Sequence, residues 1–233
     1  MNIEQLIGLD KELLLKLNGG ESIFLDGFMW FATTTYIWIP TALVLVYILF
    51  KHNGWKRGVF TIIAIALVIT AADQISSSIF KPLFHRWRPA QDPSFMYMVD
   101  IVRGYRGGRF GFISSHAANT FALTTFVYLL TRKKAILFTL LSWACLCSYS
   151  RIYLGVHYPG DIICGALVGI LCAISIFYLY TKFCNRFFYL QASSAYSHKY
   201  DGYQSGDASV LYLTFMLTLV SITTLSLVLS DIF

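Results

Sequence analysis

The sequence has little charge. Asp, Glu, Lys and Arg together make up 13% of the 233 residues, whereas 57% are hydrophobic. A soluble domain carries about twice that charged fraction, so the composition excludes a soluble globular protein. The apolar residues also come in blocks long enough to cross a bilayer, which needs roughly 20 residues per helix. The sequence therefore predicts an all-α, polytopic membrane protein that forms a single domain over residues 1–233.

The five cysteines lack the CxxC spacing of zinc sites and redox motifs. They lie within or at the edges of apolar segments, where free cysteines pack as small hydrophobic residues. No other cluster has metal-ligand spacing, so we expect no metal site. The net charge of +6 is scattered over the loops between apolar blocks. That distribution suits anionic lipid head groups and excludes nucleic acid as the expected partner.

Hydropathy predicts six transmembrane helices, at approximately 28–50, 58–80, 113–131, 135–153, 159–181 and 209–230. Residues 2–17 lack the basic start, long apolar stretch and cleavage site of a secretory signal. Their apolar residues have helical spacing, which predicts an amphipathic helix in the membrane interface. The polar stretches 85–112 and 185–208 are predicted to be loops.

Basic residues indicate the orientation in the membrane. The loops 51–57 and 132–134 each hold three basic residues and no acidic one, and short basic loops stay in the cytoplasm. Both termini and the loop 85–112 are then outside the cytoplasm. We expect an integral protein of a bacterial inner membrane whose site faces the periplasm or exterior.

Three polar fragments lie at the ends of the apolar segments, all on the same predicted membrane face. The first runs from Lys81 to Pro89 and contains Arg88, the second is Ser114-Ser115-His116, and the third is 150–161, with Arg151, His157 and Asp161. Ionisable groups in a membrane are costly and mark functional sites. Three cations, two imidazoles and a carboxylate are the groups needed to hold a phosphate, attack it and protonate what leaves. The fragments predict an enzyme acting on phosphate esters.

Each fragment alone has a simpler interpretation. A carboxylate four residues after an imidazole can reach it across one helical turn, but Asp161 could equally be a helix cap beside an incidental His157. Arg151 could be an arginine that extends to the membrane surface, and His116 could belong to a capping motif. Separate explanations do not account for Lys-x6-Arg-Pro, Ser-x-His and Ser-Arg-x5-His-x3-Asp in this order on one face.

In order and spacing, the fragments resemble the tripartite motif of the type 2 phosphatidic acid phosphatase (PAP2) superfamily, over roughly residues 25–185. The family's second motif usually reads Pro-Ser-Gly-His, whereas this chain has Ile113-Ser114-Ser115-His116. The resemblance implies that His157 attacks phosphorus to form a phosphohistidine, that Asp161 orients it, and that His116 is the general acid. The other motif groups would hold the phosphoryl oxygens: Lys81, Arg88, Arg151, Ser114 and the Ser115 N–H.

The resemblance implies a membrane lipid phosphatase that needs no cofactor, because side-chain cations stand where other phosphoryl-transfer enzymes use Mg²⁺. We expect a lipid phosphate as substrate, membrane lipids as surroundings and no obligatory protein partner. Lipid A phosphates and undecaprenyl diphosphate are the leading candidates, followed by phosphatidylglycerol phosphate and phosphatidate. The basic stretch with Arg103, Arg106 and Arg109 favours a head group with several negative charges, and a solvated loop is the alternative.

Other functions use parts of the same pattern. A lipid phosphotransferase would pass the phosphoryl group from the same phosphohistidine to another lipid or sugar. Six spans argue against a haloperoxidase, and the complete set of motif side chains argues against a transporter or scaffold. Asp73 and Gln74 lie inside the second span, where an acid is a functional candidate. No step requires them, so we expect a role in helix packing.

Overall fold

The structure is a computed structural model that describes residues 2–20, 22–195 and 203–232, with side chains up to 187 and from 203 to 230. The described residues form helices and no β-strand, and the β-type pairing in these ranges is an isolated bridge between Trp87 and Phe110. The helices are α1 (Ile3–Leu17), α2 (Ile23–Ala32), α3 (Ile39–Gln74), α4 (Lys81–Phe84), α5 (Ser115–Thr131), α6 (Lys134–Tyr153), α7 (Pro159–Ala195) and α8 (Ser205–Ile232). The predicted all-helical class is confirmed for this part of the chain.

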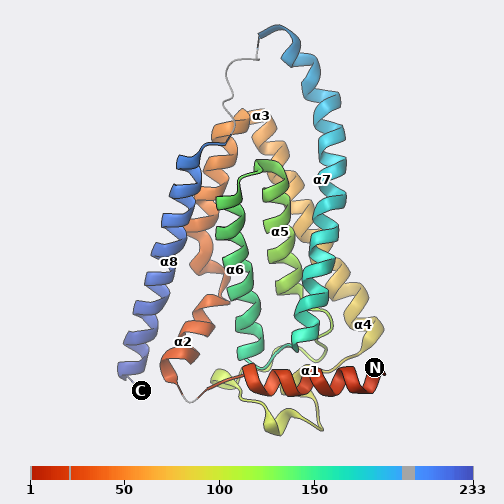
Figure 1. Cartoon of the computed structure of the whole chain (residues 1–233), viewed down its shortest axis with the longest axis vertical. Coiled ribbons are helices and arrows are strands. Elements are labelled where there is room, and N and C mark those ends of the chain that lie inside the picture. The colour runs from red at the N-terminus through yellow and green to blue at the C-terminus, as the bar shows by residue number, and fades with distance from the viewer. Residues whose placement is uncertain (1, 21, 196–202, 233) are drawn as a thin grey trace.

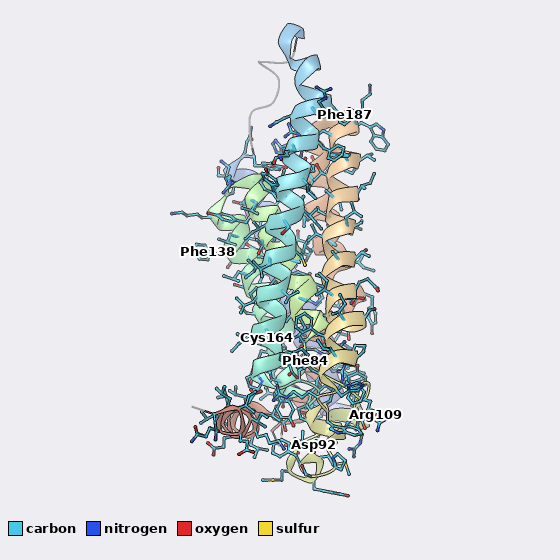
Figure 2. All side chains as sticks on the ribbon, turned by 90° about the vertical axis from the view of Figure 1, so that its right-hand side faces the viewer. Phe84, Asp92, Arg109, Phe138, Cys164 and Phe187 are labelled. Carbon is cyan, nitrogen blue, oxygen red and sulfur yellow. The ribbon has the colours of Figure 1, made fainter. Side chains whose placement is uncertain are left out.

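The long helices run side by side, and α1 lies across one end of them (Figure 1). The loop between α4 and α5 lies at that same end, as do both ends of the chain. In the perpendicular view, α1 is seen end-on and the labelled side chains of Asp92 and Arg109 lie near its level (Figure 2). Segments far apart in the sequence therefore gather at the end of the bundle that carries the three polar fragments.

Four helical segments are long and apolar enough to cross a membrane: Thr35–Phe84, Lys134–Tyr153, Pro159–Phe187 and Ser205–Ser230. The first of them folds back on itself at Gly54, whose φ of 66° and ψ of 173° are not helical. Glycine adopts such a positive φ without the steric cost that a Cβ brings. The two arms of α3 consequently run in opposite directions (Figure 1). α5 is shorter, with 17 residues.

The start of α5 is held directly against the start of α7. An added Cβ on Gly165 or Gly169 of α7 would collide with the backbone carbonyl of Ser114 or Ala118. Small residues let helix backbones approach closely in membrane proteins. This packing seats the second polar fragment, at the start of α5, beside the third, at the start of α7.

Two predicted boundaries were wrong. Residues 28–50 do not form one helix, because α2 ends at Ala32 and a 3-10 turn, Thr35–Trp38, precedes α3. The Trp38 indole donates to the Ala32 carbonyl at 2.9 Å and so satisfies one acceptor at the break. The predicted loop 185–208 is helical up to Ala195 and again from Ser205, while 196–202 lie outside the described residues. The polar composition indicated a loop, but no Gly or Pro in 185–195 stops the helix.

The predicted helix at 2–17 is present as α1. Asn2 caps it by accepting the Gln5 N–H, and the Gln5 side chain accepts the Asn2 N–H in return. This capping box satisfies two of the N–H groups left free at a helix start. The helix ends at Leu17, directly before an Asn-Gly-Gly sequence.

Candidate active site

His157 and Asp161 lie at the junction of α6 and α7. His157 comes two residues before α7 begins, and Asp161 lies in its first turn. His157 Nδ1 is 3.3 Å from Asp161 Oδ2, which also accepts the backbone N–H of Tyr158 at 3.0 Å. Both residues are buried, since His157 is 1% exposed and Asp161 is 0% exposed. The carboxylate therefore fixes the orientation of the imidazole ring, as the spacing predicts.

The charges of the three fragments act on His157 together. Burial, and the positive charges of Arg88, Arg151 and Lys81, hold the pKa of His157 well below its usual value. The imidazole is therefore neutral around pH 7, which a nitrogen nucleophile requires. These three cations come from separate parts of the chain, and the structure brings them around one ring. His116, on the first turn of α5, lies within electrostatic range of the same groups.

Lys81 is held by a hydroxyl that the family motif does not usually have. Its ammonium group donates to Ser115 Oγ at 2.8 Å, and the Ser76 hydroxyl donates to the same oxygen at 2.8 Å. Ser76 lies in a π-helical turn, Ile75–Phe80, and Lys81 is the residue that follows this turn. Such turns recur at functional sites. The serine that replaces the usual glycine thus contacts the lysine of the first fragment.

Within the described part of the chain, Arg88 and Arg151 donate only to neutral oxygens. Arg88 Nε donates to the carbonyl of Phe110 at 3.2 Å, and Arg151 donates to the hydroxyls of Thr33 at 2.9 Å and Tyr105 at 3.3 Å. Arg151 Nε is buried and has no partner among the described residues. The two arginines are 8% and 3% exposed. Such charges carry a desolvation cost that an anionic ligand would offset.

None of the ion pairs within the described ranges includes Lys81, Arg88 or Arg151. Next to these cations lies the N-terminus of α5, which begins after Ser114. Ser114 is fixed through its side chain and its backbone, since its hydroxyl accepts the Ala117 N–H and its own N–H donates to the Asp161 carbonyl. A helix N-terminus presents free N–H groups and a positive dipole end, which bind anions. The arrangement fits a phosphate group.

Arg86 is a functional candidate that the sequence reasoning missed. It donates to Asp161 Oδ1 at 2.8 Å and to Asp10 Oδ2 on α1 at 2.6 Å. One signal was available, because Arg86 lies two positions before Arg88 in a non-helical segment, so both side chains can reach the same region. The contact with Asp10 was not predictable, because nothing in the sequence places α1 against this loop.

The basic loop lies outside the buried cluster. Arg103 and Arg109 lie 5.5 Å and 4.5 Å from the ring centres of Trp30 and Trp87, and Arg106 donates to the Ala90 carbonyl at 2.7 Å. All three arginines are exposed. Their contact with a head group stays a prediction.

Asp73 and Gln74 contact neighbouring polar side chains. Asp73 Oδ1 accepts a hydrogen bond from the Asn119 amide of α5 at 3.3 Å, and the Gln74 side chain accepts one from Ser78 at 2.9 Å. The first bond ties α3 to α5, which agrees with the expected role in helix packing.

A cavity of about 790 Å³ lies beside the cluster, between α1, the loop after α4 and the start of α7. Apolar side chains such as Leu6, Phe84 and Ile163 dominate its lining, while Asp10 and Arg86 are among its few charged residues. None of Lys81, Arg88, His116, Arg151 and His157 lines it. Arg86 thus lines the cavity on one side and bonds Asp161 on the other.

The fold and the site together define a class. The site has buried cations around a neutral imidazole, and it lies at the end of a bundle of membrane-length helices. This combination is typical of a membrane hydrolase that acts on phosphoric esters. The family model of the PAP2 superfamily matches residues 62–184. The chain belongs to this family, and the predicted membership is confirmed.

Proteins similar in sequence to this chain include lipid phosphatases. The chain is 40% identical over 227 residues to the lipid A 4′-phosphatase of Bacteroides thetaiotaomicron, covering 97% of this chain and 99% of that one. It is 37% identical over 182 residues to the lipid A 4′-phosphatase of Porphyromonas gingivalis, covering 77% of each. An undecaprenyl-diphosphatase of Sulfolobus acidocaldarius is 32% identical over 172 residues, covering 71% of this chain and 76% of that protein.

A solved structure has the same fold. The crystal structure of Aquifex aeolicus LpxE is similar with a TM-score of 0.53 and 28% sequence identity, and the match covers 72% of this chain and 93% of that one.

Proposed function

We propose that the protein removes the 4′-phosphate of lipid A. The observation that carries the proposal is the group of cations around His157, namely Lys81 and the buried Arg88 and Arg151. None of them pairs with a carboxylate among the described residues. The substrate is supported by the two relatives named lipid A 4′-phosphatase, one of which aligns over 97% of this chain. Lipid A is an amphipathic lipid with several negative charges. Such a substrate suits a cationic site at the end of a bundle of membrane helices.

The proposed reaction has two steps. His157 attacks phosphorus to form a phosphohistidine. His116, protonated once the charge of the bound phosphate offsets the surrounding cations, gives its proton to the leaving alkoxide. A water molecule then attacks the phosphohistidine, His116 takes up its proton, and phosphate leaves. Asp161 keeps the imidazole in one tautomer and orientation throughout.

Positioned charges supply most of the catalysis in this scheme. Lys81, Arg88 and Arg151 neutralise the equatorial oxygens of the transferring phosphoryl group, which needs little covalent help from the protein. The Ser115 N–H at the start of α5 donates to the same group. Ser114 holds that helix start in place through its two hydrogen bonds. No cofactor is part of the scheme.

We further propose six membrane crossings, made by the two arms of α3 and by α5, α6, α7 and α8. α5 rises only about 26 Å over its 17 residues, and neighbouring helices surround it. α1 would lie in the membrane interface, where its exposed Ile3, Leu6 and Ile7 meet lipid. The basic loops at 51–57 and 132–134 belong to the end opposite the site (Figure 1). This supports a site facing the periplasm from the inner membrane.

The test is phosphate release by purified protein from a panel of lipids. Lipid A should lose one phosphate, and mass spectrometry of the product should assign it to the 4′ position. The folded His157→Ala variant should release none, because no other group is placed to attack. Activity should persist in excess EDTA. Release from phosphatidate but not from lipid A would overturn the substrate, and dependence on added Mg²⁺ would overturn the scheme.

Undecaprenyl diphosphate is the second candidate, favoured by the similarity to the undecaprenyl-diphosphatase of Sulfolobus acidocaldarius. It belongs in the same panel, where the ratio of kcat/KM values decides between the two lipids. A phosphotransferase would differ from both. It would release little phosphate until an acceptor lipid or sugar is added.

A further inference from the structure

Asp161 is held on both of its oxygens. Oδ2 contacts the His157 ring and accepts the Tyr158 N–H, while Oδ1 accepts the Arg86 guanidinium at 2.8 Å. The Arg86 guanidinium also lies 4.2 Å from the centre of the Tyr158 ring, which limits its movement. Without Arg86, one oxygen of a fully buried carboxylate would lose its charged partner. The carboxylate could then turn about its Cβ–Cγ bond, and the imidazole would turn with it.

Arg86 is itself fixed by the N-terminal helix. Asp10 of α1 accepts the second guanidinium nitrogen at Oδ2, at 2.6 Å, and accepts the Gly160 N–H at Oδ1, at 2.8 Å. Gly160 is the residue before Asp161. A single carboxylate on α1 therefore bonds both the arginine that holds Asp161 and the backbone that carries it. Side-chain exposures of 14% for Asp10 and 23% for Arg86 leave this pair only partly hydrated.

We infer that Asp10 and Arg86 are positioning residues for the nucleophile. Arg86 sets the angle of the Asp161 carboxylate, and Asp10 sets the place of Arg86, so that α1 is part of the catalytic apparatus and not only a membrane contact. The inference rests on the proposed function in one respect, the assignment of His157 as nucleophile. Neither residue touches the phosphate, so each should act on turnover and not on phosphate binding.

The neighbouring residue on α1 provides a matched control. Lys11 pairs with Asp92 at 3.0 Å, which ties α1 to the same loop without any contact to Asp161. Lys11→Gln therefore loosens the docking of α1 while it leaves Asp10 and Arg86 in place. A general effect of α1 docking would appear in Lys11→Gln, whereas a positioning effect would not.

The experiment compares kcat, KM and inhibition by inorganic phosphate for wild type, Arg86→Gln, Arg86→Lys, Asp10→Asn and Lys11→Gln. We expect Arg86→Gln to lower kcat on the order of a hundredfold, the scale of a small misplacement of reacting groups. Asp10→Asn keeps an acceptor but loses the charge, so its loss should be smaller, about tenfold. Arg86→Lys keeps one charge without the forked geometry and should retain more activity than Gln. KM and inhibition by inorganic phosphate should stay within about twofold of wild type throughout, as expected when only transition-state interactions change.

Several results would overturn the inference. A raised KM or weakened inhibition by inorganic phosphate in Arg86→Gln would make Arg86 a phosphate-binding residue, and an unchanged kcat would remove it from the mechanism. A loss in Lys11→Gln equal to that in Asp10→Asn would reduce Asp10 to a docking contact. Size-exclusion profiles and thermal unfolding identify variants that fail to fold. If Arg86→Gln is among them, Arg86→Lys and Asp10→Asn carry the test.

The assay uses p-nitrophenyl phosphate beside lipid A. Turnover of the small ester without lipid A would sink the proposed substrate and leave this comparison intact. A wild type that hydrolyses neither compound would overturn the proposed function and the inference together.

Discussion

Two sets of cations occupy the same end of the molecule and differ in their surroundings. Arg88 and Arg151 are 8% and 3% exposed, and their hydrogen bonds to the described residues go only to neutral oxygens. The arginines of the basic loop are exposed and lie against tryptophan rings or a backbone carbonyl. Water solvates the second set, whereas only a ligand can balance the first. From this comparison we propose that burial without a counter-charge, and not the number of cations, marks the anion site.

Arg86 sharpens this distinction. It comes from the same loop as Arg88, yet it has two carboxylate partners, Asp10 and Asp161. A cation already balanced in this way has little to gain from a phosphate. In the proposed mechanism its charge holds another residue, so the two arginines, two positions apart, have different proposed roles.

The largest effect is expected at Arg151. Replacing it by Gln should lower kcat/KM by about a thousandfold or more, the scale of losing a charge on the transferring phosphoryl group. The thermal midpoint should stay constant or rise, because removing an unbalanced buried charge relieves its desolvation. Arg103→Gln is the control and should change kcat/KM by no more than about fivefold, as for a single exposed contact. Equal losses in the two variants, measured by phosphate release, would erase the distinction between the sets.

The local geometry of the site could be predicted because the motif groups are close together in sequence. His157 and Asp161 are one helical turn apart, and the spacing alone brings them together. Ser114 and His116 lie at the start of a helix that hydropathy outlines within two residues. The order of the fragments then carried the assignment to a family. What depends on short-range geometry was therefore accessible without coordinates.

The remaining features depend on contacts across the chain. Asp10 meets Arg86 only because α1 folds across the end of the bundle, which no periodicity indicates. The bond from Lys81 to Ser115 needs the π-helical turn before Lys81 and the close packing of α5. The break between α2 and α3 was missed because hydropathy sums over residues and does not see a turn between apolar helices.

An intermediate effect is expected at Gly107, which borders the buried set. Its φ is +65°, and an added Cβ would lie 2.7 Å from a guanidinium nitrogen of Arg88. Gly107→Ala should displace that side chain and weaken vanadate inhibition by about tenfold, since small misplacements of binding groups are costly. Gly104→Ala is the matched control, because its φ is +67° but open space surrounds the added Cβ.

Both glycine variants should lose about 1 kcal/mol of unfolding free energy from the positive φ. Thermal unfolding checks that the strain is equal, and vanadate inhibition shows whether only Gly107→Ala affects the site. Equal inhibition in the two variants would mean that Arg88 does not need its observed position.

The effect that spares turnover is expected in the exposed set, where only KM should change. Changing Arg103, Arg106 and Arg109 together to Gln should raise KM for lipid A by about tenfold, since each exposed contact contributes no more than about 1 kcal/mol. KM for phosphatidate should rise less, because that lipid has a single phosphate. Turnover at saturation should hold, as these residues would bind ground and transition states alike.

The basic loop 132–134 supplies the control for this last variant. Changing Arg132, Lys133 and Lys134 to Gln removes the same charge from the opposite end of the molecule, where no head group is expected. The effect on KM should appear only in the first variant. It should fade as salt rises, because exposed charges are screened beyond about 8 Å at physiological ionic strength. If both triple variants raise KM equally, the loop acts through the net charge of the protein. If the first variant leaves KM unchanged for every lipid, the loop is a solvated surface, and the buried set alone selects the substrate's phosphate.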